Sequence, residues 1–244
     1  MAKWELFGRL WNLNREAASR TSEWGAGPLE GDKQHLAYLR SLHKERREAD
    51  SGIDLPLRDL EVVVVDLETT GFYPNHGDAI ISIGAVAMKG EKLLLGDSFY
   101  TLVNPNRTIP PHIVTLTGIS NEMAADAPDL VTALSRFFRY VGNRPLVAHH
   151  SRHEREFFRS AFWKMGRRPF THRTLDTMLL IRLLSNPIGN GSLDALCAMH
   201  NIPISRRHHA YCDAVAAGTL WGKYVVKAQE AGYTNLREVY EQLR

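Results

Sequence analysis

The chain has 244 residues, 44% of them hydrophobic and 23% charged, which suits one substantial α/β domain plus an appendage and excludes wholesale disorder. The formal net charge of +3 permits nucleic-acid binding but does not by itself indicate it. The two cysteines, Cys197 and Cys212, form neither a disulfide framework nor a zinc-ligand spacing, and no apolar run is long enough to span a bilayer, so we expect a cytoplasmic protein.

Residues 1–58 are predicted to form a helical appendage, and residues 59–244 the main domain. In the appendage, Trp4, Phe7 and Trp11 recur at near-helical spacing. This pattern favours a short helix packed on its own domain over a partner-binding or membrane-surface helix. Charged residues interrupt the first twenty positions, so the continuous apolar stretch of a secretory signal is missing.

From residue 61 the pattern becomes that of a folded α/β domain. Strands are predicted at 61–68, 79–88, 93–103, 144–149 and near 174–175. Helices are predicted at 110–116, 128–141, 151–165, 176–184, 192–200 and 209–229, and from about residue 235 onwards. This order predicts a mixed central sheet flanked by helices, with functional sites at the strand ends.

Two acidic residues end the first predicted strand, in the segment VVVVDLETTG. Asp66 and Glu68 are two residues apart, so both side chains project to the same face of a strand. Two like charges at the end of a buried strand are costly without a counter-ion, and a bound cation removes that cost. Taken alone, the pair is equally compatible with two solvated loop acids.

Glu154 stands at the head of an apolar stripe on the predicted helix 151–165. The apolar side chains at helical spacing after it are Phe157, Phe158, Ala161, Phe162 and Met165. Glu154 is therefore expected to point inward toward the sheet, whereas Glu156 lies off the stripe and is expected in solvent. The arginines on another face suit phosphate contacts or simply solvent; they are Arg152, Arg155 and Arg159.

Asp213 has the same relationship to the long helix 209–229. Its apolar stripe consists of Ala216, Ala217, Leu220, Trp221 and Tyr224. Two helices that each aim a carboxylate inward, together with a strand that offers two, predict a cluster of four acids. Such a cluster is the oxygen-rich environment that hard divalent ions require.

His208 lies five residues before Asp213, in the loop expected to precede that helix. From this loop its imidazole can reach a water molecule beside the metal ions. A lone histidine is more often a surface or helix-terminal residue, as the neighbouring His209 illustrates, so the role of His208 depends on the acids around it.

Together these segments resemble the DEDDh exonuclease family, which includes the proofreading epsilon subunit of the bacterial replicative DNA polymerase III. The resemblance spans about residues 61–224. DLETTG matches the first family motif, LVAHHSRHEREFF the second and HHAYCDA the third. LTGIS at 116–120 and LDT at 175–177 are similar to secondary signatures. The resemblance implies a ribonuclease H-like α/β fold.

The resemblance also implies a metal-dependent 3′–5′ exonuclease that acts on single-stranded or frayed DNA. Asp66, Glu68, Glu154 and Asp213 would bind two Mg²⁺ or Mn²⁺ ions. His208 would act as the general base, and the products would be 5′-mononucleotides.

Two positions depart from the family pattern. Glu154 stands where the family has Asp and is one methylene longer, so its metal site is expected to be shifted or weaker. His150 replaces the usual Asn, which is expected to alter the contact to the terminal nucleotide.

The resemblance also indicates where a substrate would lie. The residues expected to contact it are Thr69, Thr70, Gly71, Phe72, His150, Phe158 and Arg207. Phe72 is equally expected to stack on a base or to pack within the protein. Arg206 and Arg207 are candidates for contacts to backbone phosphates or for a solvated role.

Other functions remain open on the sequence. The acid cluster does not distinguish ribose from deoxyribose, so a 3′–5′ exoribonuclease acting on RNA 3′ ends is one alternative. A catalytically weakened subunit that binds nucleic acid or a DNA polymerase is another, and the Glu154 substitution favours it. A recruitment role for the appendage is a third.

Overall fold

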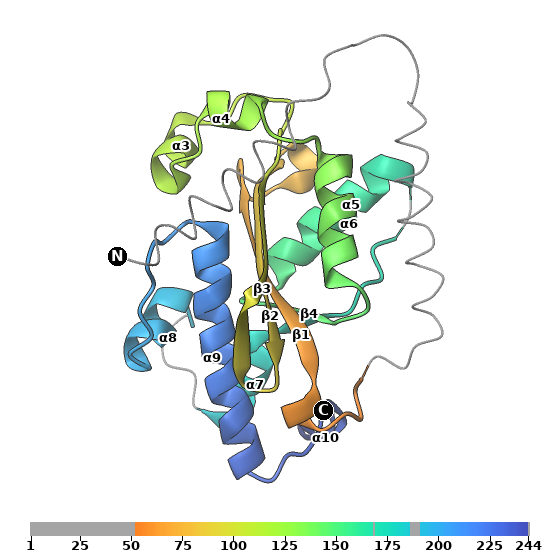
Figure 1. The fold of residues 1–244 in the computed structure, drawn as a ribbon, viewed down its shortest axis with the longest axis vertical. Coiled ribbons are helices and arrows are strands. Elements are labelled where there is room, and N and C mark those ends of the chain that lie inside the picture. Colours follow the sequence, from red (N-terminus) through yellow and green to blue (C-terminus); the bar gives the residue numbers. More distant parts are fainter. Residues whose placement is uncertain (1–51, 168, 186–190, 244) are drawn as a thin grey trace.

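The computed structural model describes residues 52–167, 169–185 and 191–243. The predicted N-terminal appendage, with Trp4, Phe7 and Trp11, lies almost entirely outside these residues. In the described part of the chain, a five-stranded sheet carries helices on both faces (Figure 1). This arrangement confirms the predicted mixed α/β architecture.

The sheet has the strand order β3-β2-β1-β4-β5. Its strands are β1 (Glu61–Thr69), β2 (Ile80–Lys89), β3 (Lys92–Leu102), β4 (Leu146–Ala148) and β5 (Thr174–Asp176). β1, β2 and β3 form an antiparallel meander, whereas β4 and β5 run parallel to β1. β1 lies at the centre because its run of valines can be buried on both faces.

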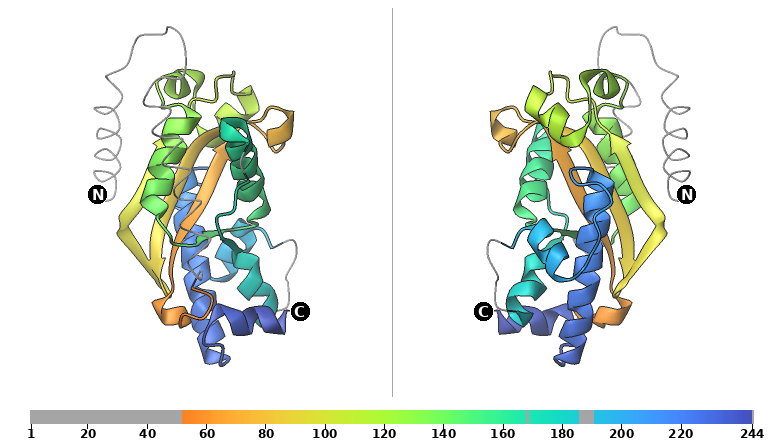
Figure 2. Two further views of the ribbon diagram at one scale, coloured as in Figure 1. Left: turned by 90° about the vertical axis from the view of Figure 1, so that its right-hand side faces the viewer. Right: turned by 90° about the vertical axis from the view of Figure 1, so that its left-hand side faces the viewer.

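The helices form one layer on each face of the sheet, and two further short helices lie at one end of the molecule. The layer on one sheet face contains α7 (Thr177–Leu184), α8 (Leu193–Met199), α9 (Ala210–Glu230) and α10 (Leu236–Gln242). The other face carries α5 (Leu130–Val141) and α6 (Arg152–Gly166). α3 (Pro111–Thr117) and α4 (Asn121–Ala125) lie at one end of the molecule and α10 at the opposite end (Figure 2).

Most predicted elements are present within a few residues of their expected bounds. The helix α4 was not predicted, although Ser120 caps it by accepting a hydrogen bond from the Met123 amide. Two short 3-10 helices, η1 (Leu57–Asp59) and η2 (Pro74–His76), were also not predicted.

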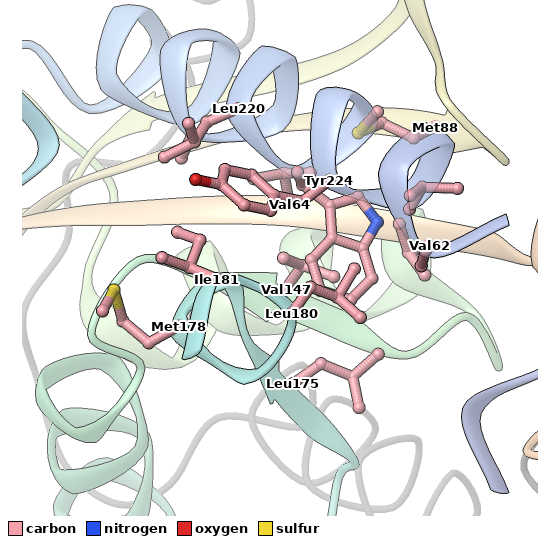
Figure 3. Close-up of a cluster of buried hydrophobic side chains, with 14 of the residues drawn as sticks. Val62, Val64, Met88, Val147, Leu175, Met178, Leu180, Ile181, Leu220 and Tyr224 are labelled. Carbon is pink, nitrogen blue, oxygen red and sulfur yellow. The ribbon is translucent and has the colours of Figure 1, made fainter. Parts of the chain in front are cut away.

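β1 alternates between two hydrophobic cores, as a period of two requires. Val62 and Val64 pack with α7 and α9, and Figure 3 shows Leu220 and Tyr224 of α9 in the same cluster. Val63 and its odd-numbered neighbours pack instead against α5 and α6. The even-numbered positions that follow therefore continue on the α9 face of the sheet.

The first turn of α9 approaches the sheet closely at Gly84 on β2. A Cβ atom at this position would collide with the backbone of Ala210 and Tyr211. Gly84 is the β2 residue paired with Asp66 of β1. The missing side chain therefore brings the N-terminus of α9 beside the acidic end of β1.

The chain ahead of residue 59 contacts the main domain. Leu57 is buried, and its amide donates a hydrogen bond of 2.7 Å to the Thr234 carbonyl. Asp54 forms an ion pair with Arg237 of α10, with a nitrogen–oxygen distance of 2.5 Å. The last residues of the predicted appendage thus contact α10 and the turn before it, and a domain boundary at 58/59 stays a prediction. Among the described residues, no helix is long and apolar enough to cross a membrane.

Candidate active site

Three carboxylates meet where β1 ends beside the start of α9. Asp66 and Glu68 both lie on the α9 side of β1, and Asp213 lies in the first turn of α9. One carboxylate oxygen from each lies within 4.8 Å of the other two. This is the spacing at which a cluster of acids can share a metal ion.

Asp213 is only 2% exposed, and the stripe predicted behind it is buried against the sheet. The two oxygens of its carboxylate differ. Oδ2 accepts a hydrogen bond of 3.0 Å from the His208 amide and another from the Arg207 guanidinium. Oδ1 is buried and has no hydrogen-bond partner among the described residues, so it is available to a cation.

Glu154 lies in the first turn of α6 and is 3% exposed. Its Oε2 atom is buried without a hydrogen-bond partner in the described part of the chain. Glu154 is not among the three acids within 4.8 Å, but its charge is close enough to raise the pKa of Asp66. Glu156 is half-buried and forms an ion pair of 2.7 Å with Arg152 at the helix surface.

These carboxylates are buried beside one another, so a bound cation would stabilise their charged forms. Burial raises the pKa of Glu68 and of Glu154 to about 8, and the neighbouring acids add to both shifts. Burial and the charges of Glu154, Glu68 and Asp213 hold the pKa of Asp66 well above its usual range. Together with the two unpartnered oxygens, this oxygen-only donor set fits hard divalent cations such as Mg²⁺ or Mn²⁺.

The adjacent histidines His208 and His209 have different environments. His208 is half-buried in the loop before α9 and has a left-handed backbone with φ of 55°. His209 is buried, its ring stacks on Tyr100 at 4.7 Å, and burial lowers its pKa to about 4. Of the two imidazoles, that of His208 is the more accessible.

The turn between β4 and α6 is held by the carboxylate of Asp176. Asp176 accepts hydrogen bonds from the amides of His150 (3.2 Å), Ser151 (2.8 Å) and Met178 (2.9 Å). His150 has a positive φ of 53°, and its Nε2 donates to the Gly191 carbonyl at 3.0 Å. Its ring is therefore anchored to the segment before α8.

The TTG segment after Glu68 forms a turn closed by hydrogen bonds. Thr69 Oγ1 donates to the Gly71 carbonyl at 2.7 Å, and Thr70 Oγ1 donates to Asp78 at 3.1 Å. The ring of Phe72 is 73% exposed and lies edge-on to His153 at 5.9 Å. The ring of Phe72 is therefore not packed in the core, and its stacking on a base stays a prediction.

The structure corrects the expected substrate contact of Phe158. Its side chain is fully buried between α5 and α6 and stacks on Phe137 at 5.7 Å. The stripe that directs Glu154 toward the sheet also places Phe158 in the core, where a substrate cannot reach it.

Arg207 does not extend into solvent. Its guanidinium is paired with Asp213 and with Asp194 of α8. Asp194 and Asp176 are the site residues that the sequence analysis did not single out. Asp176 lies within the LDT signature, but no sequence pattern pairs Asp194 with Arg207. Arg206 donates to the Thr117 carbonyl at 3.2 Å, beside the LTGIS segment.

Comparisons with known proteins agree with this geometry. The profile of the Exonuclease (RNase_T) family matches residues 63–220. The chain is 36% identical over 179 residues to a DNA polymerase III PolC-type from Caldanaerobacter subterraneus subsp. tengcongensis, covering 73% of this chain and 12% of that protein. It is 30% identical over 190 residues to the DNA polymerase III PolC-type of Staphylococcus haemolyticus, covering 78% of this chain and 13% of that protein.

Solved structures share the fold. Exonuclease X in complex with 5′ overhanging duplex DNA is similar with a TM-score of 0.57 and 21% identity, over 73% of this chain and 98% of that one. Exonuclease I of E. coli in complex with a dT13 oligonucleotide is similar with a TM-score of 0.61 and 18% identity, over 71% of this chain and 42% of that one.

Proposed function

The chain belongs to the Exonuclease (RNase_T) family, and we propose that it hydrolyses the terminal phosphodiester at DNA 3′ ends, releasing 5′-mononucleotides. The observation that carries this proposal is the meeting of Asp66, Glu68 and Asp213, with the buried acid Glu154 of α6 nearby. Two of them, Glu154 and Asp213, present buried oxygens without a hydrogen-bond partner among the described residues. A cluster of this kind is unstable without cations and serves no evident packing purpose.

Asp66, Glu68, Glu154 and Asp213 would hold two divalent ions, Mg²⁺ or Mn²⁺. When bound, such ions lower the pKa of an attacking water and stabilise charge on the departing oxygen. Burial and then the charge of Glu154 raise the pKa of Asp66, which supports a place for Glu154 beside the other three acids. We propose that Glu154, despite its longer side chain, supplies the fourth oxygen donor.

His208 is proposed to accept the proton of the attacking water. Its amide is hydrogen-bonded to the ligand Asp213, so the residue is tied to the acid cluster through the backbone. Its imidazole has no hydrogen-bond partner among the described residues and is half-buried in a loop. An imidazole in this position can reach the attacking water and accept its proton.

The substrate is proposed to be a single-stranded or frayed DNA 3′ end. The exposed ring of Phe72 offers a surface on which a base can stack beside the acids. Two structures with this fold are described as complexes with a dT13 oligonucleotide and with 5′ overhanging duplex DNA, which supports a DNA substrate. His150 and the TTG turn are proposed to face the terminal nucleotide.

A DNA polymerase is the proposed macromolecular partner. The chain spans only about an eighth of the length of the PolC-type polymerases it matches, so these relatives contain much that this chain lacks. Because these relatives are DNA polymerases, the proposed partner would supply the 3′ ends on which this chain acts.

Incubation of the protein with end-labelled oligonucleotides tests the proposed function. Single-stranded DNA labelled at its 5′ end should shorten from the 3′ end in Mg²⁺ or Mn²⁺ and remain intact in EDTA. An RNA oligonucleotide of the same sequence should be degraded more slowly. Failure to shorten either polymer in the presence of metal would refute the exonuclease proposal, and faster loss of RNA would reassign the substrate.

A further inference from the structure

Arg207 joins two carboxylates that lie on different helices. Its Nε and Nη2 atoms donate to the two oxygens of Asp194, at 2.7 and 3.1 Å. Its Nη1 atom donates to Oδ2 of Asp213. The two-point contact with Asp194 fixes the plane of the guanidinium, and that plane fixes where Nη1 meets Asp213.

The consequence for Asp213 is that its two oxygens are no longer equivalent. Oδ2 is occupied by Arg207 and by the His208 amide, whereas Oδ1 is buried without a hydrogen-bond partner in the described part of the chain. A carboxylate held in this way can offer only one oxygen to a cation. We propose that Arg207, anchored by Asp194, is a positioning residue that sets Asp213 as a one-oxygen metal ligand; this inference rests on the proposed function.

The pairing of Arg207 with Asp194 also constrains the loop that precedes α9. Arg207 immediately precedes His208, whose backbone is in the left-handed region. Both residues are tied to the same oxygen of Asp213, so the loop and the metal ligand move together. Asp194 thereby links α8 to the acid cluster through Arg207, although its own side chain is 59% exposed.

If Arg207 only neutralises the charge of Asp213, its removal should change the metal affinity in the opposite direction. If the guanidinium only neutralised Asp213 until a metal ion displaced it, removing Arg207 would free a ligand and strengthen metal binding. Simple charge repulsion between Arg207 and a cation predicts the same direction. A positioning role predicts weaker metal binding, because Asp213 loses its fixed orientation. The sign of the change therefore separates these roles.

The test is a Mn²⁺ titration of the full chain followed by thermal unfolding, which needs no turnover. Arg207→Gln and Asp194→Asn should each raise the Mn²⁺ concentration for half-maximal stabilisation by about tenfold or more. Asp194→Glu keeps the negative charge but lengthens the side chain by one methylene, and it should also weaken Mn²⁺ binding. Excess Mn²⁺ should restore most nuclease activity to Asp194→Asn.

The chain offers a matched control in the half-exposed pair Arg144–Asp97, whose nitrogen–oxygen distance is 2.7 Å. Asp97→Asn should leave the Mn²⁺ titration unchanged. Unchanged or tighter Mn²⁺ binding in Arg207→Gln would overturn the positioning role while leaving the exonuclease proposal intact. A wild-type chain that neither binds Mn²⁺ nor degrades DNA would overturn both.

Discussion

Asp66 of β1 pairs in register with Gly84 of β2, and the space left by the missing Gly84 side chain is filled by the first turn of α9. A glycine on one strand thus determines how closely Asp213 can approach the carboxylates of the next. The spacing of the acid cluster depends on this contact as much as on the acids themselves.

Substitution of Gly84 should impair activity more than stability. In Gly84→Ala the added methyl collides with the backbone of Ala210 and Tyr211, so the first turn of α9 must move away. A displacement of about 1 Å at a catalytic centre costs roughly a hundredfold in rate. We expect this loss in kcat/KM on a single-stranded oligonucleotide, with a stability loss of about 1–3 kcal/mol by chemical denaturation.

Gly222 provides the matched control for this prediction. It lies toward the opposite end of α9, where a methyl group would collide with the backbone carbonyl of Glu91. Gly222→Ala should therefore lower stability to a similar extent and leave kcat/KM within about twofold of the wild type, because the catalytic end of α9 stays in place. Equal losses of activity in both variants would contradict a local role for Gly84.

The stability of the metal-free protein should fall as the pH rises. The folded-state pKa of Glu68 and of Glu154 is about 8, above the ordinary value of 4.5, so folding favours their protonated forms. This contribution is fully present below about pH 4.5 and is lost as the pH rises through 8. The unfolding temperature in EDTA should accordingly be lower at pH 8.5 than at pH 5.5.

Mg²⁺ should reverse this trend, since cations bind the deprotonated acids. Its stabilising effect on the unfolding temperature should be larger at pH 8.5 than at pH 5.5. Glu154→Gln removes one of the two carboxyl groups whose pKa is raised to about 8, so the stability of this variant in EDTA should depend less on pH. A pH-independent unfolding temperature in EDTA would argue that the acids are not crowded together in the folded protein.

The two adjacent histidines should respond differently to substitution. His208→Ala should retain oligonucleotide and metal binding but lose about 10²- to 10⁴-fold in kcat, as expected when a general base is removed. His209→Ala should lower the unfolding temperature instead, because the buried ring stacks on Tyr100. Binding by fluorescence anisotropy in Ca²⁺ and turnover in Mg²⁺ separate the two effects. Near-normal turnover in His208→Ala would refute its role.

Phe72 should contribute to substrate affinity without contributing to stability. Stacking of one base on an aromatic side chain is worth about 1–3 kcal/mol, so Phe72→Ala should raise KM for single-stranded DNA about 5- to 150-fold. Because the ring is 73% exposed, the unfolding temperature should not change. Trp163→Ala removes another exposed aromatic, which is 59% exposed on the outer surface of α6, and should leave KM unchanged.

The sheet, most helices and the positions of the four acids could be predicted from local patterns. The alternation along β1 and the stripes behind Glu154 and Asp213 depend on residues close in sequence, and such patterns report burial directly. The meeting of Asp66, Glu68 and Asp213 at the end of β1 agrees with this reasoning, and a metal-binding role for Glu154 stays a prediction.

The rest of the site depends on contacts that no local pattern contains. The pairing of Arg207 with Asp194 arises because a loop folds back onto α8, and the space at Gly84 depends on how α9 crosses β2. Phe158 was misassigned because its position in the family motif was given more weight than the apolar stripe, which already predicts its burial. What the sequence does not give is its partner in the core, the ring of Phe137 on α5.

The position of Asp213 on α9 has a consequence for the order of events during synthesis. The carboxylates of β1 emerge from the ribosome early, but the metal site lacks Asp213 until the chain has been made through α9 and its apolar stripe has docked on the sheet. A nascent chain that stops short of α9 therefore holds acids with no complete site. If the proposed function holds, nuclease activity should appear only after α9 has been made and has docked on the sheet.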